Sequence, residues 1–109
     1  YKYFNEFLKM LNNEKKFIRV RGFRLICSLV KWDNENKINK NIDIILKELE
    51  DEKGTSVRQC LEKLNLILMH KIELTDIIEN KVRNLELSKY KESLQFLIKK
   101  DIDYILKHL

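Results

Sequence analysis

The sequence predicts an all-α fold: a short right-handed superhelix of about five to six stacked helices in a single domain, 1–109. The 109 residues include no proline and only two glycines, so the chain lacks the turn residues that a β-rich fold requires. A polar turn followed by an aliphatic–arginine pair occurs twice, and the leucines before these turns, Leu11 and Leu49, lie 38 residues apart. A repeat of this length with helical patterning is typical of stacked helix pairs.

Apolar residues recur every three or four positions and delimit the first helices. We predict one helix at 2–11 and a second at 16–32, which is apolar over most of its circumference and should therefore lie between neighbouring helices. Gly22 in the second helix predicts a close approach to an adjacent helix, because glycine otherwise costs about 1 kcal/mol in a helix interior.

The third predicted helix, 37–49, is apolar on one face only, so we expect it to lie on the outside of the fold. Its free face is a candidate surface for a protein partner and carries Lys37, Lys40, Asp43, Lys47 and Glu48. Three further helices are predicted, the first of them capped by Thr55 or Ser56, at 56–70, 74–85 and 88–109. The pattern leaves open whether the last segment is one bent helix or a pair broken near 99–101.

The repeated stretch joins a helix that ends in leucine to a helix that opens with arginine. Its two copies are Leu8-Lys-Met-Leu11 before Ile18-Arg19-Val20-Arg21, and Ile45-Leu-Lys-Glu-Leu49 before Asp51 and Val57-Arg58. These motifs resemble HEAT-type repeats, over residues 3–85, and so imply a HEAT-like or ARM-like solenoid. The resemblance also implies a ladder of hydrogen bonds between repeats, with Asp51 and Arg58 as its acidic and basic members. In the first copy Glu14 would replace the aspartate, with Arg19 or Arg21 as its partner.

The whole chain is also similar to a set of small bacterial HEAT-like proteins of unknown function, some of which carry an iron–sulfur-assembly label. A cluster usually takes four thiolates, whereas this chain has only Cys27 and Cys60. Both cysteines fall on apolar helix faces and are predicted to be reduced thiols of the core. We therefore expect a cytoplasmic protein without a cofactor.

Neither a membrane segment nor a signal peptide is predicted. The apolar runs are only a few residues long, whereas a membrane span needs about 20, and the first residues lack the apolar core of a signal peptide. Because Tyr1 already lies within a helical pattern, we expect further residues upstream, including the initiating Met. The uncovered first helix, 2–11, is a candidate contact with a second copy, so a homodimer is one alternative.

Positive charge is concentrated in the first half of the chain. Residues 1–49 hold 11 Lys/Arg against 6 Asp/Glu, whereas residues 50–109 hold 11 of each. The segment 15–31 contains no acidic residue and carries Lys15, Lys16, Arg19, Arg21, Arg24 and Lys31. These residues form either a solvated helix face or a patch for a phosphate backbone or an acidic partner. Phe17 and Phe23 are predicted to point into the core, which leaves few rings for stacking on a single strand.

No residue set indicates catalysis or metal binding. His70 and His108 stand near helix ends without partners at ligand spacing, and the acidic run Glu50-Asp51-Glu52 lacks the closing glutamate of a calcium loop. Neither a glycine-rich phosphate loop nor a nucleophile triad is present. Trp32-Asp33 invites comparison with the Trp- and Asp-lined groove of HEAT-type alkylpurine glycosylases, but we predict a mostly buried Trp32 at a helix corner.

Three hypotheses follow for the function. The favoured one is a non-enzymatic helical-repeat scaffold that mediates protein–protein interaction. The alternative is a nucleic-acid-binding domain that uses the basic residues of 15–31. An alkylpurine DNA glycosylase-like activity is the third.

Overall fold

The computed structural model describes residues 1–109 and contains helices and turns without any strand, which confirms the predicted all-α class. It has seven α-helices and three short 3-10 segments, so the predicted number of helices is too low. The α-helices are α1 (Phe4–Met10), α2 (Lys16–Ser28), α3 (Lys37–Lys40), α4 (Ile42–Leu46), α5 (Gly54–His70), α6 (Thr75–Arg83) and α7 (Glu92–Lys107). The 3-10 segments are η1 (Val30–Trp32), η2 (Lys47–Glu50) and η3 (Ile72–Leu74).

The additional α-helix comes from the segment 37–49, which is interrupted at Asn41. Asn41 has φ −115° and ψ 17°, outside the helical range, and it separates α3 from α4. Its side-chain Nδ2 donates a hydrogen bond of 2.8 Å to the carbonyl of Lys37. Asparagine side chains compete in this way with the backbone ladder of a helix, so a continuous apolar face does not ensure a continuous helix.

The end of the chain forms a single helix, which settles the alternative left open for 88–109. α7 runs for 16 residues without a break, but it begins at Glu92 rather than at 88. Lys91, the residue before it, is extended with ψ 148°, and no side chain caps the helix. α5 likewise begins at Gly54, so neither Thr55 nor Ser56 is its N-cap.

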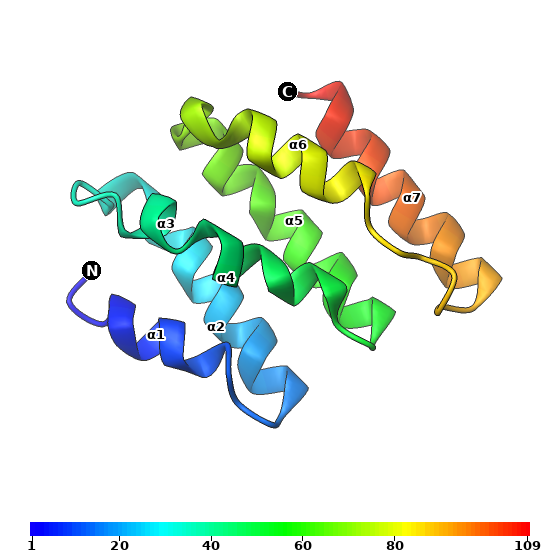
Figure 1. Ribbon diagram of the computed structural model, residues 1–109, viewed down its shortest axis with the longest axis horizontal. Helices are drawn as coiled ribbons and strands as arrows, with labels where there is room; N and C mark the ends of the chain where they lie inside the picture. Colours follow the sequence, from blue (N-terminus) through cyan, green and yellow to red (C-terminus); the bar gives the residue numbers. More distant parts are fainter.

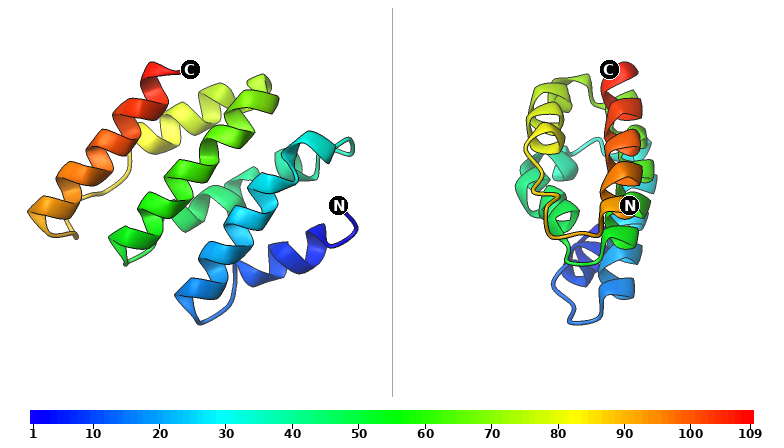
Figure 2. Two further views of the ribbon diagram at one scale, coloured as in Figure 1. Left: turned by 180° about the vertical axis from the view of Figure 1, so that it is seen from behind. Right: turned by 90° about the vertical axis from the view of Figure 1, so that its right-hand side faces the viewer.

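The helices form two layers, as Figure 1 and the edge-on view in Figure 2 show. One layer holds α1, α3 with α4, and α6, and the other holds α2, α5 and α7 side by side. The chain alternates between the layers, so each helix of the second layer follows one of the first. The molecule measures 40 × 32 × 17 Å, as a flat two-layer stack should.

The core lies between the two layers and is entirely apolar at its centre. Its fully buried members include Phe4, Phe23, Ile26, Leu64 and Ile98. Cys27 and Cys60 are buried free thiols within it, and burial raises the pKa of both above the ordinary cysteine value. No helix is both long enough and apolar enough to cross a membrane.

α2 packs on two neighbours, as its sequence predicts, and Gly22 marks one of these contacts. A Cβ atom at Gly22 would lie 2.7 Å from the Cβ of Met10 and 3.0 Å from the carbonyl oxygen of Phe7. The predicted close approach is therefore confirmed, and its neighbour is α1. On its other side α2 lies against α5, and the surface between these two helices forms the groove described next.

Candidate functional site

An open groove of about 600 Å³ runs between α2 and the start of α5, the helices that lie side by side in Figure 2. Residues of the first two-thirds of α2 form one wall, and the turn before α5 with its first two turns forms the other. The lining residues are Lys16, Phe17, Val20, Arg21, Arg24, Lys53, Thr55, Ser56 and Gln59.

The groove has four cationic side chains and no carboxylate. Lys16, Arg21, Arg24 and Lys53 line it, and none of them takes part in any of the ion pairs within 4.0 Å in the structure. Like charges gathered around a concavity raise the local positive potential, and an anionic ligand relieves their mutual repulsion. The groove is thus suited to an anion.

The N-terminus of α2 adds to this potential, because α2 has no acidic residue in its first turn to balance its partial positive charge. α5 also lacks an acidic residue in its first turn, but the Asp51 carboxylate before it accepts the amide of Lys53, the N-cap residue, at 2.8 Å. Thr55 and Gln59 are exposed on the α5 wall and supply neutral hydrogen-bonding groups beside the cations.

The structure divides the basic residues predicted for 15–31 into three groups. Lys16, Arg21 and Arg24 converge on the groove. Lys15 and Lys31 are exposed outside it, with their ammonium nitrogens 6.0 Å and 4.4 Å from the ring centroids of Phe17 and Trp32. Arg19 does not line the groove, because its guanidinium is held by Glu48 and Asp51.

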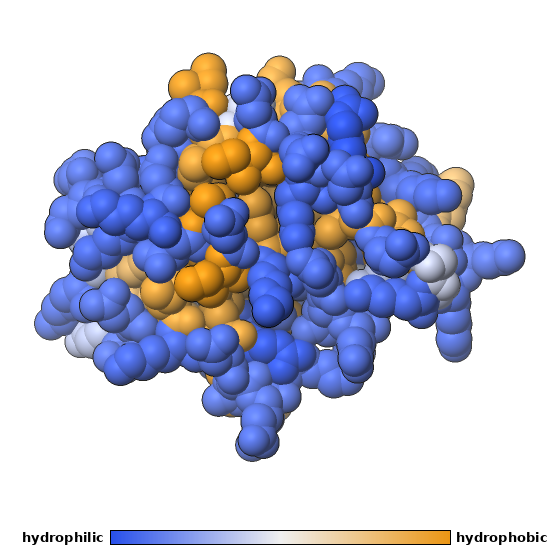
Figure 3. Space-filling model, viewed as in Figure 1, coloured by the Kyte–Doolittle hydropathy of each residue, from blue (hydrophilic) through white to orange (hydrophobic).

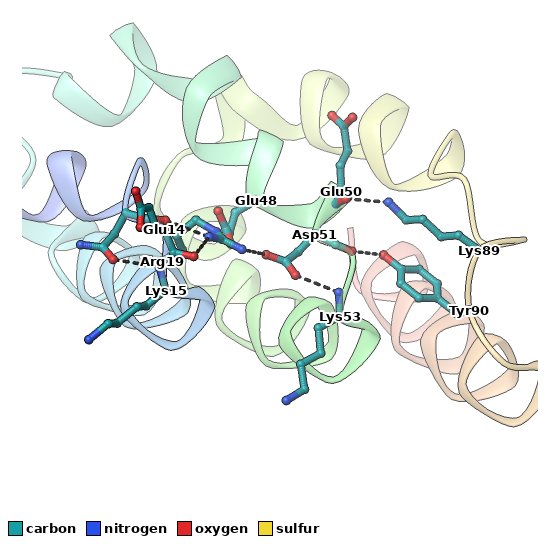
Figure 4. A network of polar contacts seen from close by, with 10 residues as sticks. Glu14, Lys15, Arg19, Glu48, Glu50, Asp51, Lys53, Lys89 and Tyr90 are labelled. Atoms are coloured by element: carbon teal, nitrogen blue, oxygen red, sulfur yellow. Dashed lines mark hydrogen bonds and ion pairs between the residues drawn. The ribbon is translucent and has the colours of Figure 1, made fainter.

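Arg19 is the centre of a polar network that Figure 4 shows. Its Nη2 lies 2.7 Å from Oδ2 of Asp51, and its Nε lies 3.3 Å from Oε1 of Glu48. Its Nη1 also donates to the carbonyls of Asn13 and Glu14, at 2.8 Å and 3.0 Å. The network therefore fixes the turn before α2 to the turn before α5.

Asp51 extends this network to the last helix pair. The hydroxyl of Tyr90 donates to the backbone carbonyl of Asp51, and the side chain of Asp51 accepts the amide of Lys53 at 2.8 Å. Burial alone would raise the pKa of Asp51, but the hydrogen bonds from Arg19 and Lys53 hold it below its usual value. Burial and the adjacent Asp51 carboxylate instead raise the pKa of Glu48 to about 7.

The predicted ladder residues Asp51 and Arg58 do not pair with each other. Asp51 pairs with Arg19 of α2, and Nε of Arg58 lies 2.7 Å from Oδ2 of Asp101 on α7. Arg58 lies seven residues after Asp51 and its side chain faces α7, so it does not reach the turn that holds Asp51. Glu14 forms no ion pair and takes part only through its carbonyl.

Two aromatic residues lie on the surface, contrary to prediction. Phe17 is 68% exposed and Trp32 is 52% exposed, whereas Phe23 is fully buried as predicted. Phe17 stands in the first turn of α2, where no earlier helix covers it, and Trp32 lies in η1, after the α-helical phase has ended at Ser28. Helix periodicity could indicate the exposure of Phe17, because at about 100° per residue it falls on the polar stripe of Arg21 and Arg24. Trp32 instead continues the apolar spacing of Leu25 and Leu29, so the pattern does not show its exposure.

Asp33 does not share a surface with Trp32, because its side chain is fully buried. It accepts the backbone amides of Lys37 and Ile38, each at 2.9 Å, and pairs with Lys71 at 3.1 Å. Asp33 thus fixes the start of α3, and its carboxylate is not exposed to serve as the acidic residue of a glycosylase-like groove. His70 and His108 are exposed and apart from other ligands, and no three His, Cys, Asp or Glu side chains are grouped to hold a metal ion.

Comparisons with protein-family models, with curated proteins and with solved structures find no match for this chain. The HEAT-type resemblance therefore stays a prediction, and the groove has to be interpreted from its own chemistry.

Proposed function

We propose that this chain is a non-enzymatic, HEAT-like helical binding module whose α2–α5 groove binds the phosphate backbone of nucleic acid. The observation that carries the proposal is the set of four unpaired cations around a groove without a carboxylate. Arginine suits this ligand, because its planar guanidinium donates paired hydrogen bonds to phosphate oxygens. Two of the four cations are arginines, Arg21 and Arg24.

A protein-binding scaffold is the second candidate, and it rests on the other layer. Figure 3 shows apolar surface interrupting the hydrophilic surface on the face of α4 and α6. Ile44 on α4 is 50% exposed and Ile77 on α6 is 44% exposed. The charged face expected beside them is smaller than predicted, because Glu48 is buried against Arg19. This candidate predicts a specific protein partner that is retained without Arg21 and Arg24.

The nucleic-acid proposal is tested by measuring affinity against salt. We expect the double variant Arg21→Ala/Arg24→Ala to weaken binding of a short oligonucleotide by at least about tenfold at low salt. We also expect the slope of log K against log salt to decrease by about 1.4, since each phosphate contact to a single strand contributes about 0.7. Fluorescence anisotropy at salt concentrations between about 50 and 200 mM measures both the affinity and the slope, because phosphate contacts make binding depend strongly on salt in this range.

The matched control removes two charges from the opposite layer. Lys40 and Lys47 are exposed and lie away from the groove, so Lys40→Ala/Lys47→Ala changes the net charge equally. This variant should keep both the affinity and the salt slope within about twofold of wild type. Undetectable binding at low salt, or an equal loss in both double variants, would overturn the proposal.

A further inference from the structure

We infer, on the basis of the proposed function, that the α2–α5 groove selects single-stranded nucleic acid, with Phe17 as the platform on which an unpaired base stacks. Phe17 is both a lining residue of the groove and 68% exposed. An uncovered phenyl ring leaves apolar surface in water, which costs about 25 cal/mol per Å². The Lys15 ammonium lies 6.0 Å from the centroid of the Phe17 ring, and no other aromatic side chain packs on this ring.

The ring and the arginines share one stripe of α2. At about 100° per residue, Phe17, Arg21, Arg24 and Ser28 fall within about 60° of one another, along about 16 Å of helix. The segment η1 then follows and carries the second exposed ring, Trp32, with the Lys31 ammonium 4.4 Å from its centroid. Exposed rings at both ends of a row of cations match how proteins hold single strands, with bases on aromatic faces and phosphates on basic groups.

A duplex fits the same surface poorly. Neighbouring packed helices have axes about 8–10 Å apart, so the depression between them admits one strand rather than a double helix. The bases of a duplex are also stacked on each other and closed to Phe17, whereas an unpaired base presents a free face. An acidic polypeptide could neutralise the cations, but it offers no flat face to the ring.

The test compares a 12-nucleotide oligo(dT) and a 12-base-pair duplex on the full chain, using the variant Phe17→Leu. Leucine keeps the apolar bulk and removes the aromatic face, so we expect about tenfold weaker single-strand binding. The salt slope should be unchanged, and Phe17→Tyr should restore the affinity. Phe96→Leu on α7 is the matched control, because Phe96 is also exposed, at 60%, with the Lys100 ammonium 5.3 Å from its ring centroid.

The outcomes separate this inference from the proposed function. Equal affinity for duplex and single strand, with no effect of Phe17→Leu, overturns the inference and leaves the groove as a general phosphate site. Absence of binding to either nucleic acid, or tighter binding to polyglutamate or to vesicles of anionic phospholipid, overturns both. The fluorescence of Trp32, the sole tryptophan, gives a second measurement: single-stranded but not duplex DNA should quench it in wild type and in Phe96→Leu.

Discussion

Two arginines of this chain make ion pairs of equal length in different surroundings. Both the Arg19–Asp51 and the Arg58–Asp101 pairs have a nitrogen–oxygen distance of 2.7 Å. The side chain of Asp51 is 3% exposed and that of Glu48 beside it is 7% exposed, whereas those of Arg58 and Asp101 are 39% and 25% exposed. Solvent screens the second pair, so length alone does not rank the two contributions to stability.

We expect Arg19→Ala to lower the free energy of unfolding by about 3 kcal/mol, because it leaves a buried carboxylate without its counter-charge. Arg58→Ala should cost about 1 kcal/mol or less, since water can replace a partly exposed partner. Urea unfolding followed by circular dichroism measures both values, and the two variants serve as controls for each other. Equal losses of stability in the two variants would show that the buried network contributes no more than the partly exposed Arg58–Asp101 pair.

Individual residues of the candidate site were only partly predictable. The charge pattern predicts Lys16, Arg21 and Arg24, because a helical segment without acidic residues offers its cations no ion-pair partner nearby in the sequence. It also includes Arg19, whose acidic partners lie in η2 and in the turn after it, about 30 residues later in the chain, and no local pattern reveals them. Lys53 was missed for the same reason, since α2 and α5 meet only in the folded chain.

At the scale of the element, α2 determines the site, because it packs on α1 through Gly22 and presents its cations to the α5 side. The two roles depend on the same helix orientation. The Met10 Cβ and the Phe7 carbonyl leave no space for a side chain at Gly22 without movement of α1 or α2.

We therefore expect Gly22→Ala to destabilise the protein by about 1–3 kcal/mol, through overpacking. Helix propensity alone predicts the opposite sign, a gain of about 1 kcal/mol, so the direction is diagnostic. Ser28→Ala, at an exposed position of the same helix, should change stability by no more than about 0.5 kcal/mol. A more stable Gly22→Ala protein, measured by thermal unfolding, would contradict the close packing of α1 on α2.

The helix boundaries could be predicted where apolar periodicity acts alone and not where side chains compete with the backbone. α2, α5 and α7 lie within the predicted segments or within two residues of them, because each buries a long apolar stripe. The break at Asn41 depends on an amide hydrogen bond to a carbonyl four residues earlier. The apolar spacing continues through this break, so the pattern could not show it.

At the scale of the whole molecule, buried acids connect the layers and make stability depend on pH. Glu48 lies between α4 and the Arg19 side of α2, with Asp51 beside it in the following turn. Its pKa rises from 4.5 to about 7 through burial and the Asp51 charge, so the folded state binds a proton that the unfolded state releases. Stability should therefore fall as pH rises from about 4.5 to about 7.

Asp33 and Asp51 act in the opposite direction at lower pH. Burial would raise the pKa of each, but hydrogen bonds from Tyr1 and the amides of α3 lower that of Asp33, as those from Arg19 and Lys53 lower that of Asp51. Their contribution to stability is present above the ordinary aspartate pKa of 3.8 and is lost as the pH falls through the lower pKa values that these two groups have in the folded protein. The two effects together place the stability maximum at about pH 4, between the ordinary pKa values of 3.8 for aspartate and 4.5 for glutamate.

Urea unfolding of wild type and Glu48→Gln between about pH 4 and pH 8 tests this profile. Wild type should lose on the order of 2 kcal/mol between pH 5 and pH 8, as Glu48 ionises in a buried site. Glutamine mimics the protonated acid, so Glu48→Gln should show little loss over this range and exceed wild type in stability at pH 8. Glu52→Gln, an exposed change in the adjacent turn, should keep the wild-type decline. A flat wild-type profile, or an unchanged decline in Glu48→Gln, would show that Glu48 is ionised in the folded protein throughout and that Arg19 neutralises both carboxylates.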